Sequence, residues 1–325
     1  MVAENKDERI RIVKGKVFLD DKCLKDKKHP LGKSRQEKTV YTCVFIFFCL
    51  WSILLLYPVL WVFLNSFKDA DQYYLDIMPV TGNPFAIPEI WHFENYPYAF
   101  SQISIRTATG YATIFDMLFN TIWYCGLRVG MGVFIPMATA YAMAKYKFHG
   151  RQATYTFVVI SLIIPIFGTG GASFTFYYDM GMYNSPLFVI FTGLGGFGGS
   201  FLIMYGYFKS ISWEYAEAVF IDGGGHWTVF LKIMIPMALP IGLTFAVMGF
   251  IGAWNDYGTM LVYLPDYPTL ASGVYNLTQG NDSLAQVNPP AYFALLIIMT
   301  IPVLAIFIAF SDLIMNNLTI GGIKG

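Results

Sequence analysis

Long apolar runs separated by more polar stretches dominate the chain, and this pattern predicts helices that cross a membrane. Each run holds about twenty or more mainly apolar residues, the length that a helix needs to span a hydrocarbon layer roughly 30 Å thick. Six runs occupy residues 40–64, 118–144, 153–177, 187–208, 229–254 and 291–315. We therefore expect an all-α, polytopic membrane protein with about six transmembrane helices.

Composition supports a membrane protein. Only 13% of the 325 residues are charged and 56% are hydrophobic, whereas about 25% of an average soluble domain is charged. The first run is too long for a cleaved signal peptide, and so is the charged leader before it. The four cysteines form no C-x-x-C pair, so neither a disulfide framework nor a metal site is predicted.

The distribution of basic residues predicts the topology. Residues 1–39 contain twelve of the 21 Lys and Arg residues, which places the amino terminus in the cytoplasm by the positive-inside rule. We expect a flexible cytoplasmic tail over 1–39 that can touch anionic lipid, and a transmembrane domain over 40–325 with an extracellular loop at 65–117. Formal net charge is zero, so the overall balance says nothing about an acidic or basic partner, and we expect no nucleic acid partner.

One cytoplasmic loop, residues 209–236, is long enough for two short helices. Ser212 is expected to be the N-cap of the first helix, with Glu214 in its first turn. A run of three glycines, 223–225, should end that helix because glycine adopts left-handed backbone angles at little cost.

The same loop contains Glu217-Ala218-Val219, three residues, Gly223, nine residues, Ile233, one residue and Ile235-Pro236. It resembles the EAA signature of ABC importer permeases, in which Ala stands in place of Val219 and Leu in place of Ile235. Ala140-Tyr141-Ala142 and Trp254-Asn255-Asp256 are similar to the carbohydrate branch, that of maltose-type permeases. Together these likenesses cover roughly residues 118–275.

This resemblance implies a multi-subunit importer in a bacterial plasma membrane, with both termini of the chain cytoplasmic. The implied partners are a second permease subunit, which would make a heterodimer, two ABC ATPase subunits, an extracellular solute-binding protein and a sugar substrate. ATP and Mg would be bound by the ATPase subunits, because the sequence contains no G-x-x-x-x-G-K-[ST]. The chain itself would be a non-catalytic subunit without a cofactor.

A permease without its own nucleotide site needs a segment that contacts its ATPase and transmits its motion. A short amphipathic helix that binds in a groove of the ATPase can be that segment. We expect Ala216 and Ala218 to permit close approach, the apolar side chains of Tyr215, Val219 and Phe220 to fill the groove, and Glu217 to make a charged contact. The alternative is a surface helix that only joins two spans. The predicted ATPase-coupling residues are Glu214, Tyr215, Ala216, Glu217, Ala218, Val219, Asp222 and Gly223.

The sequence offers fewer candidates for contacts with a substrate than for contacts with an ATPase. An aromatic side chain beside hydrogen-bonding groups suits sugar recognition, although the same residues could anchor a helix end at the membrane surface. Arg128 lies inside the second run, where a charge is costly, so it should face the bundle or an aqueous cavity and either pair structurally or contact substrate. The predicted path residues are Asn120, Arg128, Trp254, Asn255, Asp256 and Tyr257.

Other patterns are weaker. Residues 193–198 fit G-x-G-x-x-G, but no strand precedes them, so backbone flexibility or close helix packing is the better interpretation. A secondary transporter would need acidic groups inside the spans, and runs one to five have none. An intramembrane enzyme would need a nucleophile with a base or a metal cluster, and neither is readable. A permease for a non-sugar solute remains an alternative.

Overall fold

The computed structural model describes residues 10–13, 16–19, 35–108, 110–164, 168–279 and 283–318. Regular structure in these residues is helical apart from two short antiparallel hairpins. This confirms the all-α prediction. The chain divides into two compact units, Met1–Trp61 and Val62–Gly325, and each is described by itself.

The first unit contains a hairpin and most of one long helix. Strand β1 (Ile10–Val13) pairs with β2 (Lys16–Leu19) so that Ile10 lies opposite Leu19. The sequence analysis did not predict these two strands within the tail, where Ile and Val favour extended backbone. Helix α2 (Arg35–Asn65) covers the first apolar run and begins five residues before it.

Helix α2 is apolar on every side. No residue in its most hydrophobic window is buried, and most of its large side chains, Phe45 and Leu50 among them, are more than half exposed. A helix that is hydrophobic all round needs lipid or another chain around it, because water would leave this surface unfavourably solvated.

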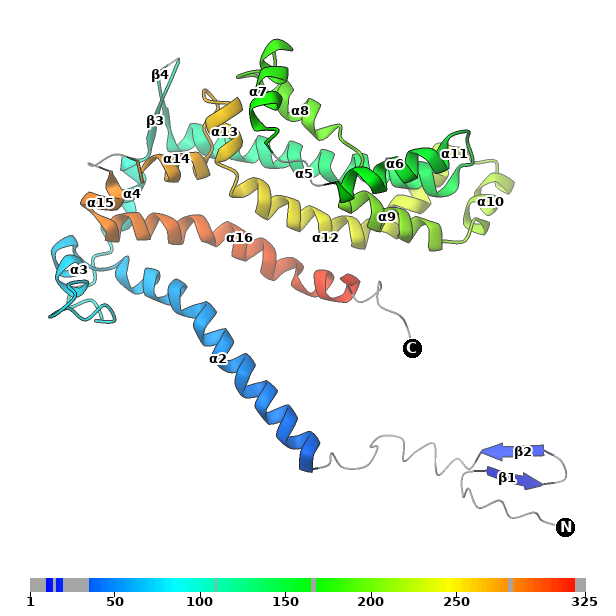
Figure 1. The fold of residues 1–325 in the computed structure, drawn as a ribbon, viewed down its shortest axis with the longest axis horizontal. Helices are drawn as coiled ribbons and strands as arrows, with labels where there is room; N and C mark the ends of the chain where they lie inside the picture. Colours follow the sequence, from blue (N-terminus) through cyan, green and yellow to red (C-terminus); the bar gives the residue numbers. More distant parts are fainter. Residues whose placement is uncertain are drawn as a thin grey trace. The chain divides into compact units, whose positions relative to one another are not determined.

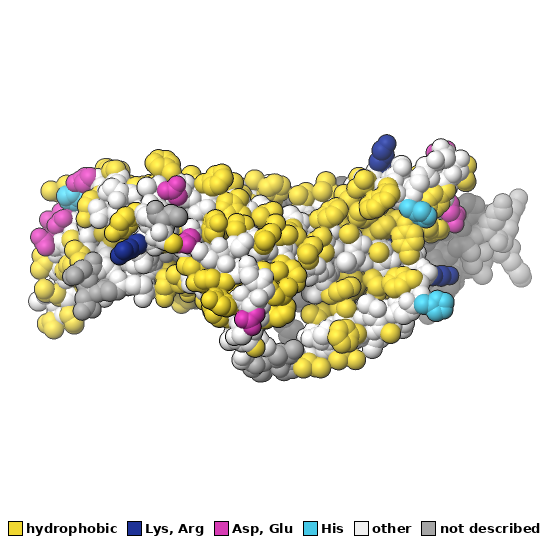
Figure 2. All heavy atoms as spheres, turned by 90° about the horizontal axis from the view of Figure 1, so that it is seen from above, with side chains coloured by type: hydrophobic (Ala, Val, Ile, Leu, Met, Phe, Trp, Pro, Cys, Tyr) yellow, Lys and Arg dark blue, Asp and Glu magenta, His cyan; other side chains and the backbone are white. Residues whose placement is uncertain are grey.

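Three long helices form the framework of the second unit. Helix α5 (Ile114–Lys145) packs against α12 (Ile235–Trp254), and α12 packs against α16 (Pro289–Leu318), so that the three run side by side (Figure 1). These helices confirm the second, fifth and sixth apolar runs as helical. Hydrophobic side chains cover much of the face in Figure 2, and most of the charged side chains on it lie toward its two ends.

The third and fourth runs are each broken into two helices. Run three forms α6 (Arg151–Ile163) and α7 (Gly170–Asp179), and run four forms α8 (Leu187–Gly193) and α9 (Gly199–Ser210). Ile164 precedes a proline in the sequence and is extended (φ −74°, ψ 113°), as a residue before proline prefers. Four continuous helices among the described residues are thus long and apolar enough to span a membrane.

The glycines between α8 and α9 allow close packing on α5. A Cβ added at Gly193 would lie 2.9 Å from the sulfur of Met131, and one at Gly196 would lie 2.8 Å from a methyl carbon of Thr139. The Thr139 hydroxyl also donates to the Gly196 carbonyl at 2.9 Å. The predicted role of these glycines in helix packing is confirmed.

A π-helix leads into α12. The short α11 (His226–Thr228) continues as the π-helix η2 (Val229–Met234), in which each backbone hydrogen bond spans five residues, where in an α-helix it spans four. The ring of Phe230 stacks on Tyr141 of α5 with a centroid distance of 4.9 Å. The π-helix is thereby fixed against the framework.

The described part of the loop between α2 and α5 contains regular structure. It contains α3 (Ala70–Asp76), α4 (Asn95–Gln102) and a hairpin of β3 (Ser104–Thr107) and β4 (Gly110–Thr113), which the sequence analysis did not predict. The ammonium group of Lys68 is wholly buried and lies 2.7 Å from the carboxylate of Asp76. Short helices α13 (Gly258–Tyr263), α14 (Leu270–Asn276) and α15 (Leu284–Val287) complete the same end of the unit.

Candidate functional site

The predicted coupling segment forms a separate short helix, α10 (Glu214–Ile221). Its N-cap is Trp213, one residue later than predicted, and Trp213 makes no side-chain capping bond. Ser212 still contributes, because its hydroxyl accepts a hydrogen bond from the Glu214 amide at 3.3 Å. Glu214 and Glu217 both lie in the first turn, where negative charge is favourable.

The glycines end α10 as the sequence predicts. Gly223 is left-handed, with φ +81°. The Gly224 amide donates to the Val219 carbonyl at 2.8 Å, and the Gly223 amide donates to Phe220 at 3.1 Å. These two bonds form a Schellman motif, which satisfies carbonyls that the helix leaves open. The turn therefore fixes both the length of α10 and the direction in which the chain leaves it.

The inner face of α10 differs from the expectation. Ala216 has no exposed surface, and Val219 and Phe220 pack with it on the core around Tyr141 and Phe208. Ala216 is therefore covered by its own domain, whereas Val219 and Phe220 stay partly exposed. The helix uses these side chains to attach itself to its own domain.

The outer face of α10 is free for a partner. Ile221 is 86% exposed, and Trp227, just beyond the glycine turn, is 74% exposed. The sequence analysis missed both; a large apolar residue beside a glycine turn in a polar loop was the available signal. The predicted residues that are exposed on this segment are Glu214, Tyr215, Glu217, Ala218, Asp222 and Gly223.

Contacts with the end of α5 hold the coupling segment in place. The Lys145 ammonium donates to the Ile211 carbonyl at 2.5 Å. The Tyr146 hydroxyl lies 3.0 Å from Nδ1 of His226, and its ring makes an edge contact with Trp213. A displacement of α10 would therefore be passed to α5 and, through η2, to α12.

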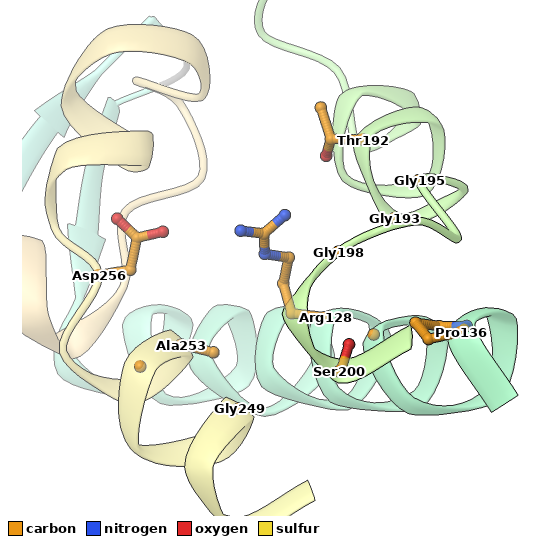
Figure 3. A pocket seen from close by; sticks show the side chains of 12 residues that line it. Arg128, Pro136, Thr192, Gly193, Gly195, Gly198, Ser200, Gly249, Ala253 and Asp256 are labelled. Carbon is orange, nitrogen blue, oxygen red and sulfur yellow. The ribbon is translucent and has the colours of Figure 1, made fainter. Parts of the chain in front are cut away.

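A second candidate site is a cavity of about 500 Å³ among α5, α8, α9 and α12. The residues that line it are Arg128, Gly132, Pro136, Thr192, Gly193, Gly195, Gly198, Ser200, Gly249, Gly252, Ala253 and Asp256. In Figure 3 the Arg128 side chain rises from α5 into this space, with Asp256 on one side and Thr192 on the other. The predicted placement of Arg128 toward a cavity is confirmed.

Asp256 is held by the protein around it. One carboxylate oxygen accepts from the Tyr124 hydroxyl at 2.5 Å and from the Thr259 hydroxyl at 2.7 Å, and the other accepts from the Thr259 amide at 3.0 Å. Arg128, by contrast, makes no hydrogen bond or ion pair with a described residue. Its five N–H donors are thus directed into the cavity without a partner from the described chain.

The remaining predicted path residues do not line the cavity. Trp254 is only 7% exposed and donates from its indole to the Met299 carbonyl at 3.1 Å. It is therefore a buried packing residue and not a half-exposed membrane anchor. Asn120 donates to the Pro268 carbonyl at 3.0 Å and accepts from Trp123, which ties α5 to the loop before α14.

Two neighbours of Asp256 face elsewhere. The Asn255 side chain is exposed and donates back to Ile251 at 2.8 Å. The Tyr257 ring stacks on Tyr275 at a centroid distance of 4.5 Å. Of the six predicted path residues, only Arg128 and Asp256 meet at one cavity.

Comparison with known proteins gives consistent matches. Residues 132–319 match the family described as "Binding-protein-dependent transport system inner membrane component". The diacetylchitobiose uptake system permease NgcG of Streptomyces coelicolor is 27% identical over 278 residues, covering 84% of this chain and 85% of that protein. The maltose/maltodextrin permease MalG of Vibrio vulnificus is 24% identical over 309 residues, covering 90% and 98%.

A solved structure has a similar fold. A chain of a bacterial ABC transporter involved in the import of the acidic polysaccharide alginate aligns with a TM-score of 0.70. The alignment covers 87% of this chain and 99% of that one, at 20% sequence identity.

Proposed function

Because this chain belongs to the family of binding-protein-dependent transport system inner membrane components, we propose that it forms half of a membrane path for importing a sugar or oligosaccharide. It is a permease subunit of an ABC importer, as the EAA-like segment indicated. Relatives named for diacetylchitobiose, galactooligosaccharides and maltodextrin match over at least 84% of this chain and support a carbohydrate substrate.

The observation that carries the mechanism is the exposed outer face of α10. An ATPase subunit would bind Glu217, Ala218 and Ile221 in a groove and, on ATP binding, move α10 as a rigid body. Contacts with Lys145 and Tyr146 would carry that motion to α5. Two ATPase subunits, a second permease and a solute-binding protein complete the proposed assembly, in which ATP hydrolysis takes place outside this chain.

The proposal is tested by purifying the chain from bacterial membranes. Two ATPase subunits and a second permease are expected to co-elute, and reconstituted vesicles should take up a glycan only with ATP and a solute-binding protein. Glu217→Ala combined with Ile221→Ser should detach the ATPase or uncouple hydrolysis from uptake while the chain still inserts. Uptake by the chain alone, without an ATPase, would contradict the proposal.

A further inference from the structure

The cavity between α5 and α12 combines one positive and one negative side chain, and these are the charged residues among those that line it. Arg128 can only donate hydrogen bonds, and the Asp256 carboxylate can only accept them. Arg128 comes from α5 and Asp256 from the link that follows α12, and both side chains point into the same space (Figure 3). A ligand that fits both must offer acceptors and donors without adding a net charge.

From this arrangement we infer that the cavity is a subsite for one uncharged, hydroxyl-rich sugar unit and selects against carboxylated sugars. The inference rests on the proposed function and specifies its substrate class. Sugar hydroxyls both donate and accept, so neighbouring hydroxyls can meet Arg128 and Asp256 together. The cavity volume of about 500 Å³ falls within the roughly 300–1,000 Å³ of small-molecule sites.

A carboxylated sugar would be disfavoured for two reasons. Its carboxylate must lose hydrating water, which is costly without a compensating charge. Arg128 would attract it, but Asp256 would repel it, and the hydrogen bonds from Tyr124 and Thr259 keep Asp256 fixed at the cavity. Because the charges of Arg128 and Asp256 balance, no net positive charge remains to offset the loss of hydration.

Glycines keep the space open. Gly132 and Gly252 both line the cavity, and a Cβ added at either position would meet no atom within 4 Å. Glycine weakens a helix by roughly 1 kcal/mol relative to alanine. Unfilled positions on two helices that face the same cavity are consistent with a ligand that occupies it.

The test compares heat protection of the purified complex by two ligands, without its binding protein. One is a neutral oligosaccharide, and the other is the same molecule with a primary hydroxyl oxidised to a carboxylate. The wild type should be protected by the neutral sugar at a concentration about tenfold lower. We call the difference between the two protective concentrations the gap. Asp256→Asn should close or reverse this gap, because it removes the repelling charge. Arg128→Gln should widen the gap, because it removes the attracting charge.

Two control variants are matched to these changes. Asp266→Asn also removes one negative charge, but Asp266 bonds to Asn184 and does not line the cavity, so it should leave the gap unchanged. Gly132→Leu should abolish protection by either sugar. Gly126→Leu, on the same helix but outside the cavity, should not. Co-elution of the ATPase subunits reports that each variant still folds.

Three results would overturn the inference: stronger protection by the carboxylated sugar, a gap unchanged in Asp256→Asn, or no protection by either sugar. The proposed function stands if the complex still assembles and imports a glycan with ATP. It fails separately if no ATPase co-elutes and no glycan is imported.

Discussion

Lys68 shows how one residue can organise a loop outside the spans. Its ammonium group is fully buried 2.7 Å from Asp76, and its carbonyl accepts from the Asn95 side chain at 2.8 Å. Lys68→Met should lower the free energy of unfolding by roughly 3–5 kcal/mol, because the Asp76 charge would lose its partner. Thermal unfolding of the purified complex measures this effect.

The double variant Lys68→Met with Asp76→Leu is the matched control. It removes both charges, so it should recover most of the lost stability. Equal unfolding temperatures for the single and double variants would show that the ion pair does not hold the loop.

At the scale of single residues, the sequence predicts where a charged side chain in a span must face, but not which way the residues at a helix end face. The free-energy cost of placing a charge in a membrane span was enough to predict that Arg128 faces a cavity. It could not separate Trp254 from Asp256, two residues apart, although one is packed against α16 and the other lies at the cavity. That difference depends on where α12 ends and how α16 crosses it, which no local pattern contains.

Among the elements, α10 allows a comparison between two alanines on opposite faces. Ala216 has no exposed surface, whereas Ala218 is exposed. Ala216→Leu should overfill the core and lower stability by roughly 1–3 kcal/mol. Ala218→Leu should leave the unfolding temperature unchanged but reduce ATP-driven uptake several-fold, because it would obstruct the proposed ATPase contact.

Unfolding temperature and uptake are to be measured on both variants in the same membranes. A loss of stability in Ala218→Leu, or normal uptake by it, would contradict the assignment of the outer face.

The glycine turn after α10 offers a second comparison. Gly223 has φ +81°, whereas Gly225 has φ −100° and space around its Cα. Gly223→Ala should lower stability by roughly 1–2 kcal/mol, because a Cβ is strained in left-handed backbone. Gly225→Ala should have little effect. Similar unfolding temperatures for the two variants would argue against the turn described above.

The length of α10 and its glycine end were predictable, but its faces were not. Its eight residues are apolar at most positions, so helical periodicity is compatible with more than one buried side. Packing against Tyr141 and Phe208 determines which side is buried, and those residues come from α5 and α9. Hydropathy alone could not show that runs three and four are each broken into two helices, because both runs are apolar throughout. The glycine and proline residues at the breaks were the available signal.

On the scale of the whole molecule, the predicted topology can be tested with a membrane-impermeant thiol reagent. Cys23 precedes the first span, and Thr81 is exposed in the loop after it. In intact cells, Thr81→Cys should be labelled at position 81 while Cys23 is not. Inverted vesicles should give the opposite result. Labelling of Cys23 in intact cells would contradict a cytoplasmic amino terminus.

The number of apolar runs and their lengths made the membrane class predictable, because a bilayer imposes one length on every span. The hairpins were not predictable in the same way. Each pairs strands of four residues, too short to give a clear alternating pattern. The EAA-like spacing identified the family where physical pattern alone gave only a membrane protein.

The π-helix that precedes α12 holds one residue more than an α-helix joining the same two ends would need. Deleting one residue within Val229–Met234 should therefore convert it to ordinary α-helix and leave the faces of α11 and α12 in nearly the same relative orientation. A one-residue deletion within α12 would instead turn the preceding segment by about 100° relative to the cavity residues. The π-helix is thus the place in this part of the chain where a change of length is best tolerated.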